Sequence, residues 1–245
     1  MATPRFYCST PLAAHSVIPL PTELAHHAIR VLRLKSDSQI VLFDGLGGEY
    51  PARLVIEGKN GSAITEAHLP VEAELTGQIT LVQGIASGDK MDWIIEKATE
   101  LGASKVVPIA ARRSVLQLSG ERLQKRLLHW RRIAQAASEQ CGRNRIMEVS
   151  EPCSLQAWLE SPVAADHVRL LCHPESSLTL AQALDAKQPD TLSVLVGPEG
   201  GWAEEEIALA NQYALTQVQF GPRVLRTETA GLALISAISA LRAWN

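Results

Sequence analysis

Residues 192–202 read L-S-V-L-V-G-P-E-G-G-W, a short apolar run that ends in a proline and three glycines. The apolar part predicts a buried strand, and the glycines predict a tight loop whose backbone a ligand can approach closely. Glu204, Glu205 and Glu206 follow at once and predict a helix whose first turn is acidic. Ligands of open parallel sheets settle at the carboxyl ends of strands, so this stretch is a candidate binding site.

The three acids argue against a polyphosphate ligand at this loop. A phosphate would need the helix N-terminus that the carboxylates occupy, and the G-x-x-x-x-G-K-[ST] motif is missing. A neutral or cationic adenosine derivative fits better, and S-adenosylmethionine (AdoMet), which carries a sulfonium and no phosphate, meets that description. The alternative is a glycine-rich strand-to-helix turn that binds nothing.

A second loop of the same kind lies near the C-terminus. Residues 220–230 read F-G-P-R-V-L-R-T-E-T-A; they follow a predicted strand at 217–220 and open an apolar helix over 230–241. Thr227 or Thr229 can cap that helix. Two glycine-proline loops, each at the end of a strand, predict one shared site.

Strands and helices alternate along the chain after residue 77. The predicted strands are 79–85, 105–110, 170–172, 192–196 and 217–220, and the predicted helices include one that begins after Asp89 and ends at Gly102 and one over 121–140. This alternation predicts an α/β fold with a mostly parallel sheet covered on both faces. The first ~70 residues read as mostly strands and turns, with a hairpin formed by 39–43 and 49–56, and residues 70–77 are a candidate linker.

The composition is typical of a soluble protein with a sizeable core: of 245 residues, 46% are hydrophobic and 20% are charged. No apolar run approaches the ~20 residues that cross a bilayer, and the N-terminus lacks the apolar stretch of a signal peptide. We therefore expect a cytoplasmic protein without membrane contact. The four cysteines form no C-x-x-C pair and the seven histidines form no H-E-x-x-H motif, so no disulfide framework and no metal site is expected.

The formal net charge is −3, yet the basic residues are concentrated in one segment. Residues 111–146 contain nine lysines and arginines against two acids, a local net charge of +7. In the predicted helix, Arg122, Arg126, His129 and Arg132 are spaced so that they share one face. Such a patch favours a polyanion partner, held through phosphate contacts that give affinity rather than sequence readout. The alternative is a solvated outer face.

Six blocks of the sequence together are similar to one known family. They are H-H-A-I-R-V-L-R-L at 26–34, F-D-G-L-G-G-E-Y at 43–50, K-A-T-E-L-G at 97–102, E-Q-C-G-R at 139–143, G-P-E-G-G-W at 197–202 and L-R-T-E-T-A at 225–230. In this order they resemble the bacterial 16S ribosomal RNA (uracil-N3)-methyltransferase family, RsmE, of the SPOUT class of AdoMet-dependent enzymes. The resemblance covers nearly the whole chain.

The resemblance implies a small PUA-like β-barrel domain over 1–72 that binds RNA. It also implies a SPOUT-type α/β methyltransferase domain over 73–245, with a C-terminal trefoil knot. The expected protein is a homodimer that methylates N3 of a uridine, uridine 1498, in 16S rRNA of the small ribosomal subunit. The alternatives are a SPOUT enzyme that acts on another RNA or on a ribose 2′-hydroxyl, a non-catalytic RNA-binding assembly factor, and an ordinary metabolite-binding α/β protein.

Within this scheme, Arg226 is the first candidate to stabilise a uracil anion, and Arg112 or Arg113 is the next. Glu228 or Glu199 would accept the proton, or would serve only as a structural cap. The residues expected to contact AdoMet are Leu171, His173, Val196, Gly197, Glu199, Gly200, Phe220, Gly221, Leu225, Arg226 and Thr229. The residues expected to contact RNA are Arg30, Arg33 and Lys35 in the first domain and Arg122, Arg126, Arg132 and Arg143 in the second.

Overall fold

The structure is a computed structural model that describes residues 3–58, 60–115 and 119–244. The chain forms two compact units. The first comprises Met1–Glu74 and Ser138–Ile146, and the second comprises Leu75–Ala137 and Met147–Asn245. The first unit therefore includes a segment distant in sequence from the predicted N-terminal domain, for which no local pattern in the sequence gives a signal.

The first unit contains a five-stranded sheet in the order β1-β3-β4-β5-β2. Its strands are β1 (Arg5–Tyr7), β2 (Val17–Pro19), β3 (Gln39–Phe43), β4 (Tyr50–Glu57) and β5 (Asn60–Thr65). The predicted hairpin is confirmed, because β3 and β4 pair antiparallel with Gln39 opposite Arg53. The β1–β3 pair is parallel, and the pairs β3–β4, β4–β5 and β2–β5 are antiparallel.

Residues 22–31, in the part of the chain predicted to be mostly strands and turns, are helical. The α-helix α1 (Thr22–His26) continues into one π-helical turn, η1 (His27–Val31). Ala25 and Ala28 are buried on its inner side, three residues apart. A helix of this length is too short for an apolar stripe to stand out in the sequence.

The second unit confirms the predicted parallel sheet. Its strands are β6 (Gln78–Gly84), β7 (Lys105–Ile109), β8 (Glu148–Val149), β9 (Val168–Cys172), β10 (Thr191–Val196) and β11 (Thr216–Val218), in the order β11-β9-β10-β6-β7-β8. All five neighbouring pairs are parallel. Val194 of the central strand lies opposite Leu81 on one side and Leu170 on the other.

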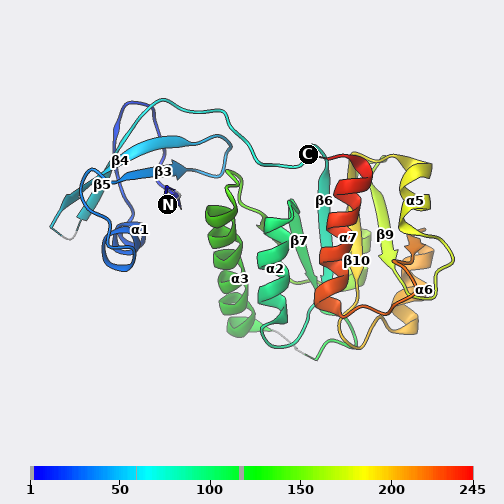
Figure 1. Cartoon of the computed structure of the whole chain (residues 1–245). Helices are drawn as coiled ribbons and strands as arrows, with labels where there is room; N and C mark the ends of the chain where they lie inside the picture. Colours follow the sequence, from blue (N-terminus) through cyan, green and yellow to red (C-terminus); the bar gives the residue numbers. More distant parts are fainter. Residues whose placement is uncertain (1–2, 59, 116–118, 245) are drawn as a thin grey trace. The chain divides into compact units, whose positions relative to one another are not determined.

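Helices cover both faces of this sheet (Figure 1). One core cluster packs α2 (Lys90–Glu100), α3 (Gly120–Cys141), α5 (Leu180–Lys187) and α7 (Thr227–Arg242) on the sheet, and the other packs α4 (Leu155–Glu160) and α6 (Glu204–Gln212). Successive strand residues alternate between the clusters, so Leu81 belongs to the first and Val82 to the second. No helix in the described part of the chain is long and apolar enough to cross a bilayer.

The C-terminal helix does not stay beside the edge strand that precedes it. After β11 the chain returns across the sheet, and α7 packs on the central strands β6 and β10 and beside α2 (Figure 1). A C-terminal knot requires such a return, and the knot itself stays a prediction of the resemblance. Arg226 occupies the N-cap position of α7, and neither predicted threonine caps this helix. The hydroxyl of Thr227, the first residue of α7, instead donates a hydrogen bond to the first glycine-proline loop.

Candidate active site

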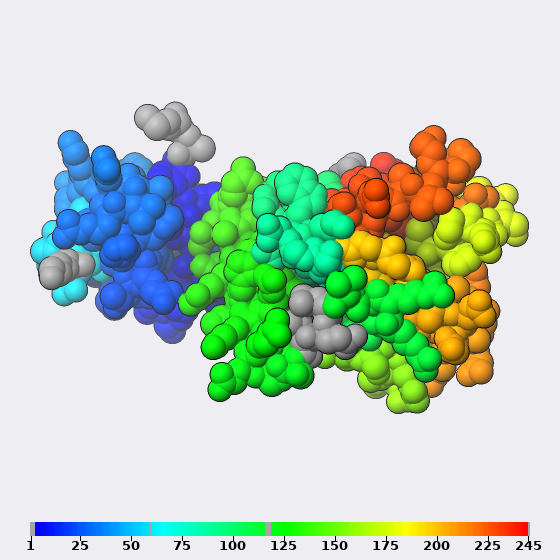
Figure 2. Space-filling view, turned by 90° about the horizontal axis from the view of Figure 1, so that it is seen from below, coloured from blue at the N-terminus to red at the C-terminus, as the bar shows by residue number. Residues whose placement is uncertain are grey.

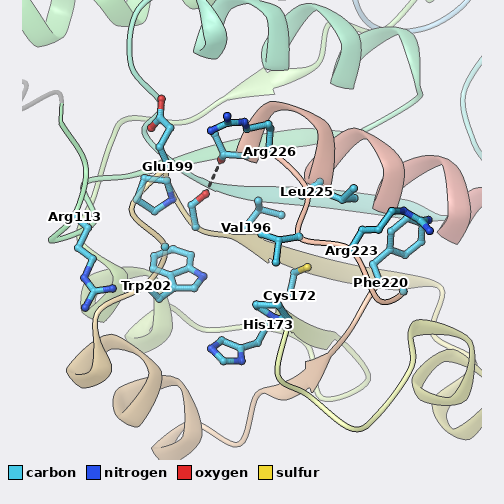
Figure 3. Close-up of a pocket in the computed structure, with 18 residues that line it drawn as sticks. Arg113, Cys172, His173, Val196, Glu199, Trp202, Phe220, Arg223, Leu225 and Arg226 are labelled. Carbon is cyan, nitrogen blue, oxygen red and sulfur yellow. Dashed lines mark hydrogen bonds between the residues drawn. The ribbon is translucent and has the colours of Figure 1, made fainter.

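A cavity of about 580 Å³ lies at the carboxyl ends of β9 and β10, within the size range of pockets that hold small ligands (Figure 3). It is lined by Arg113, Cys172, His173, Pro174, Val196, Gly197, Pro198, Glu199, Gly201, Trp202, Phe220, Gly221, Arg223, Val224, Leu225, Arg226, Thr227 and Ala230. Both glycine-proline loops therefore contribute to one pocket, as the sequence predicts.

A buried hydrogen-bonded chain joins the two loops. The hydroxyl of Thr227 donates to the carbonyl oxygen of Gly197 at 2.6 Å. The side-chain amide of Gln83, at the end of β6, donates to the Thr227 hydroxyl at 2.8 Å. Gln83 is fully buried, and a buried polar chain of this kind fixes the geometry of the groups it connects. The second loop is therefore held against the first by its own helix start.

Of the three acids at the start of α6, only Glu206 is buried, at 7% exposure. Its carboxylate accepts from the backbone N–H of Ala203 at 2.9 Å and from that of Arg112 at 3.1 Å. It thereby caps α6 and fixes the segment that follows β7. Figure 2 shows that segment, in green, beside the orange α6 on the surface of the second unit.

Two neighbouring arginines of this segment point to different places. The Arg113 side chain lines the pocket, and its Nη1 donates to the carbonyl oxygen of Gly200 at 3.2 Å. Arg112 does not line the pocket; its guanidinium lies 3.5 Å from the Glu205 carboxylate. The geometry thus favours Arg113 over Arg112, two candidates that the sequence alone does not separate.

Arg226 lies at the pocket, from the loop before α7 (Figure 3). It is exposed, and no hydrogen bond or ion pair joins its guanidinium to another residue of the described chain. A guanidinium placed in this way has its donors available for a substrate oxygen. Glu228, a candidate proton acceptor, lies outside the pocket lining, and its Oε2 is buried without a partner among the described residues.

The structure places most, but not all, of the residues expected to contact AdoMet around the pocket. His173, Val196, Gly197, Glu199, Phe220, Gly221, Leu225 and Arg226 line it, whereas Leu171, Gly200 and Thr229 do not. Leu171 is 1% exposed and packs in the core cluster beneath α4 and α6. Thr227 lines the pocket where Thr229 was expected.

Sequence reasoning missed Cys172 and Trp202, which both line the pocket. Cys172 is the last residue of β9, and Trp202 lies in the loop between β10 and α6, but no pattern in the sequence singles out either side chain. Burial raises the pKa of the Cys172 thiol, which keeps it protonated at neutral pH. We therefore regard Cys172 as a wall of the pocket and not as a nucleophile.

Most of the residues expected to contact RNA are exposed. Arg30, Arg33 and Lys35 lie on the surface of the first unit, and Arg122 and Arg132 on the surface of α3. Arg126 is partly buried, with Nη1 3.7 Å from the Asp92 carboxylate of α2. Asp92 also accepts from the indole N–H of Trp130 at 3.1 Å, so an acid absent from the α3 sequence neutralises part of its basic face.

The prediction for Arg143 needs correction. This arginine is 3% exposed, and its guanidinium donates to both carboxylate oxygens of Glu74, at 3.0 Å and 2.5 Å. A guanidinium that is buried and bound bidentately to a carboxylate is not accessible to a phosphate from solvent. Arg143 is therefore part of the core of the first unit.

Comparisons with known proteins agree with this geometry. Residues 73–239 match the RNA methyltransferase domain family, and residues 20–66 match the RNA methyltransferase PUA domain family. The chain is 34% identical to ribosomal RNA small subunit methyltransferase E of Bacillus subtilis over 224 residues, which cover 89% of this chain and 87% of that protein. It is 32% identical to the protein of the same name from Mycobacterium bovis, covering 98% and 93%.

Solved structures give the same result. The crystal structure of a ribosomal RNA small subunit methyltransferase E from Neisseria gonorrhoeae, bound to S-adenosyl methionine, superposes with a TM-score of 0.90 at 33% identity, covering 98% of each chain. A putative methyltransferase from Legionella pneumophila, in complex with the bound cofactor SAM, gives 0.88 at 32% identity, covering 99% of this chain and 98% of that one.

Proposed function

Because this chain belongs to the RNA methyltransferase family that includes ribosomal RNA small subunit methyltransferase E, we propose that it transfers a methyl group from AdoMet to 16S rRNA. The acceptor is N3 of a uridine, which the resemblance identifies as uridine 1498, and the protein works with its substrate in the cytoplasm. The observation that carries the proposal is the Thr227–Gly197 hydrogen bond, which builds one pocket from both glycine-proline loops.

The residues of the pocket suit AdoMet. Val196, Phe220 and Leu225 offer apolar walls to an adenine ring, and the glycine loops offer backbone groups to its edges. Glu206 already caps the N-terminus of α6, so that end of the helix is not open to a phosphate. When bound, AdoMet supplies an electrophilic methyl group on a sulfonium.

The chain's own residues then have to activate a poor nucleophile. N3 of uracil is a weakly acidic imide, and each unit by which its pKa is lowered corresponds to about 1.4 kcal/mol. A guanidinium close to O2 or O4 stabilises the anion, as preorganised donors do for any developing oxyanion. Arg226 and Arg113 both line the pocket and are exposed to solvent. We assign the larger part of the stabilisation of the uracil anion to Arg226, whose guanidinium donors have no partner in the described chain.

RNA contacts basic residues of both units: the exposed Arg30, Arg33 and Lys35 in the first, and the exposed Arg122 and Arg132 with the partly buried Arg126 in the second. We expect the double charge reversal Arg122→Glu and Arg132→Glu to weaken RNA binding and to reduce the slope of log affinity against log salt by about 1 for each phosphate that is no longer neutralised. The measurement is a binding titration of an rRNA fragment at several salt concentrations. Lys187→Glu, a reversal on the exposed side of α5, is the control. An unchanged salt slope in the double variant would remove α3 from the RNA surface.

The active unit is a homodimer. Two large apolar side chains are exposed on the adjacent helices α2 and α7: Trp93 at 51% and Leu241 at 55%. Exposed apolar groups on neighbouring helices favour burial against a partner. Analytical ultracentrifugation should give twice the mass of the 26.6 kDa chain.

The direct test is to incubate small-subunit rRNA from cells lacking this protein with the purified chain and AdoMet, and then to map methylated nucleosides by mass spectrometry. We expect 3-methyluridine at the proposed position. Methylation of a ribose 2′-hydroxyl would support the related SPOUT activity instead. The absence of any methylation, together with no heat on AdoMet titration, would favour a non-catalytic RNA-binding factor.

A further inference from the structure

Glu199, in the middle of the first glycine-proline loop, is tied to the start of α2. Its Oε1 accepts from the backbone N–H of Ser87 at 3.0 Å, from the Ser87 hydroxyl at 2.6 Å and from the Lys90 ammonium at 2.9 Å. Ser87 follows β6, and Lys90 is the first residue of α2. One carboxylate oxygen therefore connects two segments that are more than a hundred residues apart in sequence.

This environment makes Glu199 a poor proton acceptor. Burial alone would raise the pKa of its carboxyl, but the hydrogen bonds from Ser87 and Lys90 outweigh burial and lower that pKa to about 2. An effective general base has a pKa near the working pH. Protonation of Glu199 would also break the ion pair with Lys90. The negative charge of Glu199 thus stabilises the contacts with Ser87 and Lys90 that hold the loop.

The other candidate acceptor is not placed for the reaction either. Glu228 lies in the first turn of α7 but outside the pocket lining, while its neighbours Arg226 and Thr227 line the pocket. Arginines, by contrast, are present at the pocket from two loops. A site that stabilises the uracil anion in this way can release the proton to water.

We propose that Glu199 is a positioning residue that fastens the G-P-E-G-G loop to the start of α2, and that the uracil proton passes to solvent. This rests on the proposed function. The proton of N3 leaves to a water molecule or hydroxide, and Arg226 stabilises the anion left behind. The N3 lone pair then forms the bond to the methyl carbon as the carbon–sulfur bond breaks, and that electron pair stays on sulfur.

The loop that Glu199 fastens is closely packed on its other side. A methyl group added at Gly84, at the end of β6, would lie 2.5 Å from the backbone nitrogen of Pro198. The loop is therefore held by β6 on one side and by the start of α2 on the other. Loss of the Glu199 contacts would remove the attachment to α2 and leave only the packing against β6. We expect loss of this attachment to weaken AdoMet binding more than it slows methyl transfer.

The test uses Glu199→Gln, which keeps an acceptor oxygen but removes the charge, together with Glu199→Ala and Ser87→Ala. Positioning predicts that the KM for AdoMet rises at least tenfold in Glu199→Gln while kcat falls less than tenfold, with an unchanged shape of the pH profile of kcat. The double variant Glu199→Ala with Ser87→Ala should bind AdoMet no more weakly than the worse single variant, because both remove the same attachment. Glu205→Gln, an exposed acid of the same stretch, is the matched control.

A fall in kcat of a thousandfold or more in Glu199→Gln, with an unchanged KM for AdoMet, would overturn the proposal in favour of a base. So would fully independent effects of the Ser87 and Glu199 substitutions on AdoMet affinity. Calorimetric titration measures AdoMet affinity, and so the effect of the Glu199 attachment, without requiring methyl transfer. If the wild-type protein binds AdoMet but methylates no rRNA, the proposed function fails. In that case the attachment is still supported when the effects of the Glu199 and Ser87 substitutions on AdoMet affinity are non-additive, and it is refuted when they are additive.

Discussion

Replacing Arg226 with alanine is expected to lower kcat for rRNA methylation by about 10²–10³-fold, the usual effect of removing one preorganised donor to a developing oxyanion. The reason is that its guanidinium lines the pocket with no partner in the described chain, so its donors serve the substrate. AdoMet affinity should change far less. Single-turnover methylation of small-subunit rRNA, combined with calorimetric AdoMet titration, separates the two effects.

Arg112→Ala is the matched control for this experiment. It removes another exposed arginine, but one whose guanidinium lies against Glu205 and outside the pocket lining. We expect its kcat within a factor of about three of wild type, since an exposed ion pair of this kind contributes little. Equal losses in Arg226→Ala and Arg112→Ala would show that general basicity, and not the placement of Arg226, supports the reaction.

The parallel sheet of the second unit could be predicted because its strands are apolar, short and separated by helical stretches. Gln39–Phe43 in the first unit was predicted with its observed bounds. The helical turns at 22–31 could not be predicted, because two turns are too few to establish a period. The same holds for the inclusion of Ser138–Ile146 in the first unit, which depends on tertiary partners such as Glu74.

Within the site, the loops were predictable and the exact side chains were less so. The strand at β9 is buried on both faces, and such strands carry no alternation to show which residue turns toward which side. Nothing in the sequence pattern therefore favours Cys172 over Leu171. Arg112 and Arg113 are ambiguous for a similar reason, because contacts that fix this segment, such as the one from Glu206 to the Arg112 backbone, come from residues far away in the sequence.

Arg143 illustrates a limit of charge counting. It contributes to the +7 segment in sequence, yet it is buried against Glu74, which lies about 70 positions upstream. A charge count over residues 111–146 includes Arg143 but not Glu74, which lies outside that segment. Arg126 and Asp92 show the same effect across two helices of the second unit. The basic surface available to RNA is accordingly smaller than the sequence indicates.

Gly84→Ala is expected to reduce the rate of methylation by about 10²-fold, because displacing a pocket loop by about 1 Å has effects of this size. The added methyl would lie 2.5 Å from both the nitrogen and Cδ of Pro198 and 3.0 Å from the carbonyl carbon of Gly197. These are mostly backbone atoms, which cannot rotate away, so the G-P-E-G-G loop itself must move. Overpacking of this kind also costs about 1–3 kcal/mol of folding stability.

The discriminating measurement is AdoMet affinity compared with the free energy of unfolding. Gly58→Ala is the control: its φ of +68° makes alanine unfavourable by about 1 kcal/mol, but among the described residues, chain neighbours aside, the added methyl meets no atom within 4 Å. Both variants should be less stable in urea unfolding, while only Gly84→Ala should be impaired in AdoMet binding and methylation. Since the weaker affinity would come from the displaced loop and not from reduced stability, normal AdoMet binding by a folded Gly84→Ala protein would show that the first glycine-proline loop does not form the cofactor site.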